Sequence, residues 1–145
     1  MAEIKTLLFA TDFSKGATRA CGLARALAES CDAALTLLHV ISELSDRQAR
    51  LLPAQVYQQL ATEVERQAVQ DMTKFRDKHF SDMAVATDIV IGPAHTGIID
   101  YGKKIEADLI LMGTHGRAGL QKMLLGSVAE KVVRMSPIPV LTVRE

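Results

Sequence analysis

Five short stretches of the chain are almost continuously apolar. The first is nearly all apolar from Leu7 to Ala10, and the fourth runs from Leu109 to Met112. Such runs are typical of strands in a parallel sheet that is covered on both faces. The pattern therefore predicts strands over residues 4–11, 34–41, 85–91, 109–112 and 138–143.

Between these stretches, apolar residues recur every three or four positions, which is the period of an amphipathic helix. Helices are predicted over residues 15–29, 53–79, 94–106 and 127–134. Residues 42–52 are polar, and we expect a loop or a ragged helix start there. Pro53 suits the first turn of the longest helix, whose apolar face is predicted to consist of Val56, Leu60, Val64, Ala68, Met72 and Phe75.

Strands that alternate with helices over the whole length predict an α/β fold with a parallel sheet and helices on both faces. Neither an internal repeat nor a linker interrupts the alternation, so we expect one domain over residues 1–145. A chain of this length can bury roughly 68–70% of its unfolded surface, so its core needs no metal or disulfide.

The composition argues against several classes of protein. The 17 basic residues balance the 17 acidic ones, which disfavours a nucleic-acid-binding protein that relies on overall positive charge. No apolar run approaches the roughly 18 residues of a membrane span. The chain begins with a charged strand rather than a signal peptide, and Cys21 and Cys31 lie too far apart along one helix to form a disulfide. We therefore expect a cytoplasmic protein with reduced thiols.

A glycine-containing stretch follows the fourth predicted strand. Gly113 and Gly116 come directly after the strand, and Gly126 and Ser127 begin the next predicted helix. Glycine lets the backbone approach a ligand closely, and the first turn of a helix offers unpaired N–H groups and the positive end of the dipole. The stretch therefore predicts a phosphate site. The glycines could instead be turn residues only, and Ser127 could be only a helix cap.

Three further side chains of this stretch allow two interpretations each. Arg117 and Lys122 could screen phosphate charge or simply be solvated. His115 could donate a hydrogen bond to a phosphate or a sugar, or it could be an exposed loop histidine.

Asp12 follows the first predicted strand. Ligands of such sheets bind at the carboxyl ends of the strands, where the strand order reverses. If the first and fourth strands are neighbours, Asp12 and Gly113 face one crevice. Asp12 could then accept ribose hydroxyls or hold a Mg²⁺ ion that bridges phosphates. Alternatively, Asp12 or Ser14 caps the next helix.

Catalytic machinery is hard to find in the sequence, which suggests no nucleophile–base pair and no cluster of carboxylates. His39 lies within an apolar strand and is interpreted as a core or rim histidine. Residues 97–104 match seven positions of a phosphate-binding loop, but Lys104 stands where Ser or Thr is required, and the stretch lies inside a predicted helix. A binding module is favoured over an efficient enzyme.

Several motifs resemble those of the universal stress protein family. Gly113-x-x-Gly116, nine residues and then Gly126-Ser127 are similar to the family's ATP-binding signature. The likeness extends to residues 7–14, 92–93, 107–116, 124–132 and 139–141, whereas residues 42–82 carry little of it. The resemblance implies a three-layer fold like that of the adenine nucleotide alpha hydrolases, with a five-stranded parallel sheet in the order 3-2-1-4-5. It also implies the branch of the family that binds ATP.

The resemblance also implies the positions that contact ATP. Asp12 corresponds to the family's ribose contact, and Val40 to the residue whose backbone recognises adenine. The residues that correspond to the lining of the ribose and phosphates are Gly113, His115, Gly116, Arg117, Gly126, Ser127 and Val128. Ala10, Thr11 and Met112 adjoin these positions and complete the predicted site.

Family members usually form dimers through the fifth strand, and the same is expected here. In the implied order this strand is an edge, and Val140, Leu141, Thr142 and Val143 carry no charge. An exposed edge of that kind invites pairing with another chain. We therefore predict a homodimer.

The function predicted from these observations is that of an ATP-binding regulatory module in the stress response, with Mg²⁺ or Mn²⁺ as a companion ion and an unidentified regulatory protein as its partner. Two alternatives stay open. One is a slow ATPase or nucleotidyl-transfer enzyme, and the other is a chaperone-like or adaptor protein that does not need a nucleotide.

Overall fold

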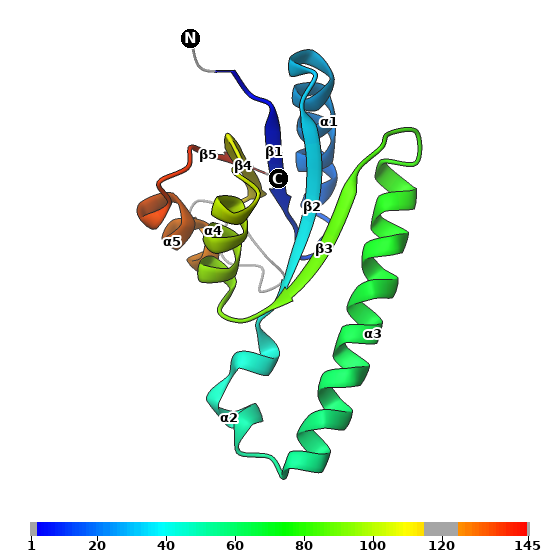
Figure 1. Cartoon of the computed structure of the whole chain (residues 1–145), viewed down its shortest axis with the longest axis vertical. Helices are drawn as coiled ribbons and strands as arrows, with labels where there is room; N and C mark the ends of the chain where they lie inside the picture. The colour runs from blue at the N-terminus through cyan, green and yellow to red at the C-terminus, as the bar shows by residue number, and fades with distance from the viewer. Residues whose placement is uncertain (1–2, 115–124, 145) are drawn as a thin grey trace.

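The structure, a computed structural model, describes residues 3–114 and 125–144. Its centre is a five-stranded parallel sheet in the order β3-β2-β1-β4-β5 (Figure 1). This confirms the order that the family resemblance implied, and it makes β1 the direct neighbour of β4. The strands are β1 (Thr6–Ala10), β2 (Ala34–Ile41), β3 (Ala86–Ile91), β4 (Leu109–Gly113) and β5 (Val140–Val143).

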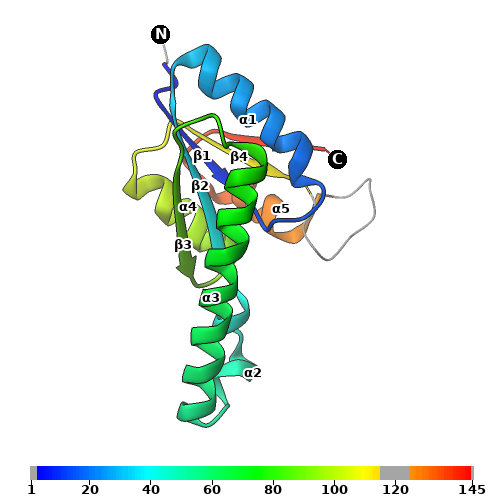
Figure 2. The ribbon, with the colours of Figure 1, turned by 90° about the vertical axis from the view of Figure 1, so that its right-hand side faces the viewer.

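Helices cover both faces of the sheet (Figure 2), as the alternation of elements predicted. On one face, α1 and α3 pack on Leu7 and Phe9 of β1, and on the other α4 and α5 pack on Leu8 and Ala10. Successive side chains of a strand point to opposite faces, so an apolar run fills both cores. The helices are α1 (Ala17–Cys31), α2 (Arg47–Arg50), α3 (Ala54–His79), α4 (Ala94–Lys104) and α5 (Ser127–Met135), with a short 3-10 helix η1 (Glu43–Ser45).

The first half of α3 extends past the end of the sheet (Figure 1), and its buried stripe differs from the predicted one. Val56 and Leu60 were predicted to face the core, but they are 46% and 40% exposed. Tyr57 and Ala61, each one residue further along, take the inward positions instead. Ala61 packs against the small cluster around Ile41 and Leu44, and Tyr57 donates from its hydroxyl to the carbonyl of Leu44 at 3.0 Å.

The polar segment before α3 is more ordered than the expected loop. It contains η1 and α2, and the carboxylate of Asp46 accepts a hydrogen bond from Gln48 N–H at 3.2 Å. An aspartate that caps the first turn in this way favours a helix that is otherwise too short to be stable alone.

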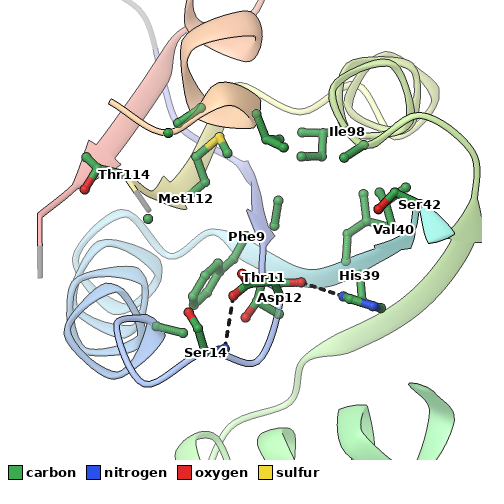
Figure 3. A pocket seen from close by; sticks show the side chains of 18 of the residues that line it. Phe9, Thr11, Asp12, Ser14, His39, Val40, Ser42, Ile98, Met112 and Thr114 are labelled. Atoms are coloured by element: carbon green, nitrogen blue, oxygen red, sulfur yellow. Dashed lines mark hydrogen bonds between the residues drawn. The ribbon is translucent and has the colours of Figure 1, made fainter. Parts of the chain in front are cut away.

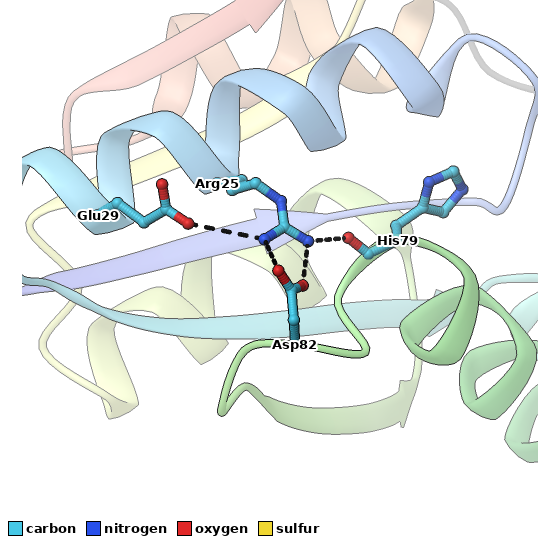
Figure 4. Close-up of polar contacts among 4 residues, drawn as sticks. All are labelled: Arg25, Glu29, His79 and Asp82. Carbon is cyan, nitrogen blue, oxygen red and sulfur yellow. Dashed lines mark hydrogen bonds and ion pairs between the residues drawn. The ribbon is translucent and has the colours of Figure 1, made fainter.

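An ion-paired arginine joins α1 to the turn between α3 and β3 (Figure 4). Arg25 makes a bidentate contact with Asp82 at 3.0 and 2.7 Å, donates to the carbonyl of His79 at 2.6 Å and lies 3.6 Å from Glu29. The Arg25 guanidinium holds the pKa of the Asp82 carboxyl below its usual range, chiefly through the hydrogen bonding of its side chain to this carboxylate. Because Asp82 is exposed, the contact fixes geometry more than it adds stability.

No predicted strand or helix end differs from the observed one by more than two residues; α1, for example, begins at Ala17 rather than at residue 15. The phosphate-loop-like residues 97–104 lie within α4, which confirms that they form no such loop. Among the helices of the described part of the chain, none has an apolar stretch long enough to cross a bilayer.

Candidate functional site

A cleft of about 290 Å³ opens where β1 and β4 end side by side (Figure 3). From β1 the sheet continues through β2 and β3 in one direction and through β4 and β5 in the other, so the strand order reverses between β1 and β4. Helices that leave the two strands depart to opposite faces there, which leaves a crevice at their carboxyl ends. The cleft is lined by residues of the β1, β2 and β4 ends and of α1, α4 and α5.

The turn after β1 forms one wall of the cleft. Thr11 and Asp12 both line it, and their side chains bond the turn itself. Thr11 Oγ1 accepts from Phe13 N–H at 3.0 Å, and Asp12 Oδ1 accepts from Ser14 N–H at 3.0 Å. The predicted capping of α1 by Asp12 or Ser14 is not observed, since Gly16 is the N-cap and no side chain bonds there.

The end of β2 continues this wall. Val40, Ser42 and Glu43 line this end of the cleft together with Ala94 and Ile98 of α4, so its lining contains both apolar and polar side chains. Helix α4 approaches Val40 closely because residue 97 is glycine. A Cβ there would lie 3.0 and 3.1 Å from the two methyl carbons of Val40, closer than carbon atoms pack without a shift.

The opposite wall consists of the end of β4 and the start of α5. Gly113, Thr114, Gly126, Ser127 and Val128 line it. Gly126 is the N-cap, and its N–H donates to the carbonyl of Thr114 at 2.6 Å. The Gly126 amide is therefore engaged within the protein and is not among the groups left for an anion.

The first turn of α5 presents N–H groups to the cleft. Glu130 N–H donates to the carbonyl of Gly126 at 2.9 Å, so the N–H groups of Ser127, Val128 and Ala129 precede the first intrahelical bond. Ser127 is the first residue of the helix rather than its N-cap, so the capping alternative for its hydroxyl is wrong. Within residues 3–114 and 125–144 no acceptor bonds these three N–H groups, and together with the helix dipole they favour an anion at this position.

Comparison with known proteins identifies the family. The sequence model of the universal stress protein family matches residues 3–144. The chain belongs to the universal stress protein family. It is 32% identical to universal stress protein MJ0531 of Methanocaldococcus jannaschii over 97% of its own length and 82% of that protein's.

Solved universal stress proteins share this fold. The structure of MJ0577, also from Methanocaldococcus jannaschii, superposes with a TM-score of 0.86 at 30% identity and covers 99% of this chain and 98% of that one. UspA from Lactobacillus plantarum has a TM-score of 0.82 at 27% identity, with coverage of 99% and 100%. A universal stress protein in complex with cAMP has a TM-score of 0.69 at 20% identity, with coverage of 99% and 98%, a likeness that shows the fold alone.

In this universal stress protein, the cleft gathers nine of the twelve residues predicted for the nucleotide site. They come from four separate parts of the chain and are Ala10, Thr11, Asp12, Val40, Met112, Gly113, Gly126, Ser127 and Val128. The other three, His115, Gly116 and Arg117, lie outside the described residues, as does Lys122.

The described lining holds few charges. Asp12 and Glu43 are its acidic residues, and no Lys or Arg is among the described residues that line the cleft. Within residues 3–114 and 125–144, no three His, Cys, Asp or Glu side chains gather into a group that could hold a metal ion. Among the described residues of the lining, the groups suited to an anion are the backbone N–H groups at the start of α5.

Sequence reasoning missed several lining residues. Ser42 and Glu43 directly follow β2, so the rule that ligands bind beyond the carboxyl ends of strands could have found them. Ala94 and Ile98 follow Gly92-Pro93 after β3 and were reachable by the same rule. His39 also lines the cleft, which agrees with its interpretation as a rim residue.

Proposed function

We propose that this universal stress protein binds ATP in the cleft between β1 and α5 and acts as a nucleotide-responsive regulatory module without efficient catalysis. One observation supports this most. The switch point of the sheet brings a carboxylate, several apolar side chains and the N-terminus of a helix around one cleft, although these features are far apart in the sequence. The glycine signature read from the sequence leads into the same helix.

The chemistry of the two walls fits the parts of a nucleoside triphosphate. Val40 and Ile98 would form an apolar slot for a flat base, and the carboxylate of Asp12 would accept from ribose hydroxyls. The N–H groups of Ser127 and Val128 would bond the phosphates. A Mg²⁺ or Mn²⁺ ion would be held mainly by the phosphates, because divalent ions of nucleotides take few protein ligands.

We also propose a cytoplasmic location, in which both thiols would stay reduced. Cys21 and Cys31 are both free, as in proteins of reducing compartments. Burial raises the pKa of the Cys21 thiol to about 12, so this thiol stays protonated and unreactive near neutral pH.

A direct experiment tests nucleotide binding. The purified protein is denatured, and the released small molecules are identified by mass spectrometry. Calorimetric titrations of nucleotide-free protein with ATP, GTP and cAMP, each with and without Mg²⁺, then rank the affinities. We expect ATP to bind most tightly. Dissociation constants for ATP above the millimolar range, together with an empty extract, would contradict the proposal and favour an adaptor that needs no nucleotide.

We also propose that the protein forms a homodimer through β5. Ile110 N–H donates to Pro139 O and Thr114 N–H to Val143 O. The carbonyls of Pro139 and Val143 therefore face β4. Because the backbone groups of successive residues in a strand point to alternate sides, the N–H and C=O of Thr142 point away from β4, to the open edge of the sheet. The other edge is less open. Gly92 N–H donates to Ile41 O, so Gly92 N–H faces β2. By the same alternation, the N–H of Ile89 faces away from β2. The carboxylate of Asp88 accepts from Ile89 N–H at 2.8 Å.

The side chain of Asp88 is itself held in place. Its second carboxylate oxygen accepts from the hydroxyl of Tyr101 at 2.9 Å. Burial and this bond to Asp88 raise the pKa of Tyr101 to about 12, so the hydroxyl stays a donor. An edge whose N–H is already bonded by an acidic side chain pairs poorly with another strand.

Substitution of Thr142 tests the dimer. Thr142→Pro removes an outward N–H without removing a bond to β4, and we expect sedimentation to show a monomer. Thr142→Val keeps the N–H and should stay dimeric. A dimer in the proline variant, or a monomer without any substitution, would contradict pairing through β5.

A further inference from the structure

The turn that follows β1 has a strained backbone beside the candidate nucleotide site. Phe13 has a φ of 64°, in the left-handed region that residues with a Cβ adopt only at a cost in free energy. Such strain persists where the surrounding structure determines the conformation, and it concentrates at binding sites. The internal bonds of Thr11 and Asp12 help to hold the turn, but both come from the turn itself.

His39 of β2 holds the turn from outside. Its Nδ1 lies 2.8 Å from the carbonyl oxygen of Thr11 (Figure 3), and its ring lies against the ring of Phe13 with centroids 4.5 Å apart. A carbonyl only accepts, so Nδ1 must carry the proton. His39 and Thr11 are 8% and 9% exposed, so water competes little for this bond.

This bond stands where the ladder between β1 and β2 would otherwise continue. Thr11 N–H donates to Leu38 O at 2.9 Å. In a parallel ladder, the carbonyl of Thr11 would next accept from Val40 N–H, but it is bonded to His39. The same alternation directs the N–H and C=O of Val40 past the end of β1, at the mouth of the cleft that Val40 lines.

We infer that His39 is a positioning residue of the nucleotide site. Its Nδ1–H donates to the carbonyl of Thr11 in place of Val40 N–H. This bond fixes the turn that carries Asp12, and it leaves the N–H and C=O of Val40 available to the base of the ligand. The inference rests on the proposed function, because it assigns His39 a role toward the same ligand. It extends that function by naming a residue that acts through its neighbours rather than by contact.

Three variants separate the hydrogen bond from the packing of the ring. His39→Leu removes the donor and keeps much of the volume. His39→Asn places an amide N–H near the position of Nδ1, whereas His39→Gln places it near Nε2. Dissociation constants for ATP and adenosine are measured by calorimetry at a temperature at which circular dichroism shows every variant to be folded.

The leucine and glutamine variants should bind both ligands about tenfold more weakly, as expected for the loss of one well-placed hydrogen bond. The asparagine variant should stay within about threefold of the unsubstituted protein. Adenosine should be affected as much as ATP, because the turn and Val40 serve the ribose and the base. In the unsubstituted protein, nitrogen NMR of the imidazole should show the Nδ1–H tautomer.

Two binding results would overturn the role of His39 alone. One is unchanged affinity in His39→Leu, and the other is an equal loss in the asparagine and leucine variants, which would trace the effect to packing. An Nε2–H tautomer would overturn it as well, even if a variant failed to fold. Failure of the unsubstituted protein to bind either ligand would overturn the proposed function, and the inference with it.

Discussion

The two walls of the cleft are built in different ways. The wall formed by the ends of β1 and β2 is held by side chains, since Thr11, Asp12 and His39 each bond the backbone of the turn. The wall at α5 is held by backbone, since Gly126 N–H bonds Thr114 O and no side chain caps the helix. A side-chain wall can select the shape of a base and a ribose, whereas a wall of N–H groups recognises negative charge.

This contrast predicts that substitutions in the two walls affect different parts of the ligand. Changes at α5 should weaken binding of ATP and spare adenosine, which has no phosphate. Changes at the β1 and β2 ends should weaken both ligands alike. The ratio of the two affinity losses is therefore the quantity to measure in each variant.

The largest effect is expected for Gly126→Asp. A carboxylate at this buried N-cap would lie where we place the phosphates, and we expect the affinity for ATP to fall by about a hundredfold or more, as for an uncompensated like charge. The affinity for adenosine should fall by less than about threefold. Asp is a favoured N-cap, and Gly126 has a φ of −61°, so the fold should survive.

Gly126→Asn is the matched control for this variant, because it has nearly the same size without the charge. It should retain most of the affinity for ATP. Full affinity in the aspartate variant would mean that the phosphates lie elsewhere, and an equal loss with asparagine would point to size rather than charge.

A smaller effect is expected for Asp12→Ala. Loss of the carboxylate removes charged acceptors from the ribose, so affinity for both ATP and adenosine should fall about tenfold, as hydrogen bonds to charged groups imply. By calorimetry, 2′,3′-dideoxyadenosine, which lacks the hydroxyls, should lose less affinity in the variant than adenosine does; the remaining loss would reflect the bond from Ser14 N–H to Asp12. A loss confined to ATP would instead place Asp12 at the metal or the phosphates.

Gly97→Ala should have an effect of only a few fold. The added Cβ would press on the methyl groups of Val40, and the base slot should narrow, so adenosine and ATP should each bind about threefold more weakly. Adding Val40→Ala makes room for the new methyl group and should restore part of the affinity. Calorimetry on the two single variants and the double variant measures this coupling, and strict additivity would show that the contact does not shape the slot.

The smallest effect is expected for Ser127→Ala. We assign recognition at this wall to backbone N–H groups, so removal of the hydroxyl should change the affinity for ATP by less than about threefold in a calorimetric titration. A much larger loss would show that this wall also recognises the ligand through a side chain, and the contrast between the walls would fail.

The sequence predicted the elements well but not every face of them. In α3 the predicted stripe and the observed one share Val64, Ala68, Met72 and Phe75, but differ at Val56 and Leu60, where Tyr57 and Ala61 face inward instead. Both stripes have helical spacing, so periodicity could not choose between them. The choice depends on Leu44 and Ile41, which meet the part of α3 that extends beyond the sheet.

For the candidate site, too, the sequence predicted some features and missed others. Asp12 and Gly113 could be placed at one crevice because each follows an apolar strand, although their adjacency needed the strand order. The bond from His39 to Thr11 joins residues 28 positions apart, and no local pattern announces it. The engagement of Gly126 N–H by Thr114 likewise depends on how the backbone returns to β4.

The most direct test of the account is a crystal structure of the protein with ATP and Mg²⁺. We expect electron density for the nucleotide in the cleft, with the base between Val40 and Ile98, the ribose at Asp12 and the phosphates within hydrogen-bonding distance of Ser127 and Val128 N–H. Density for the nucleotide at another surface, or phosphates directed away from α5, would contradict the account.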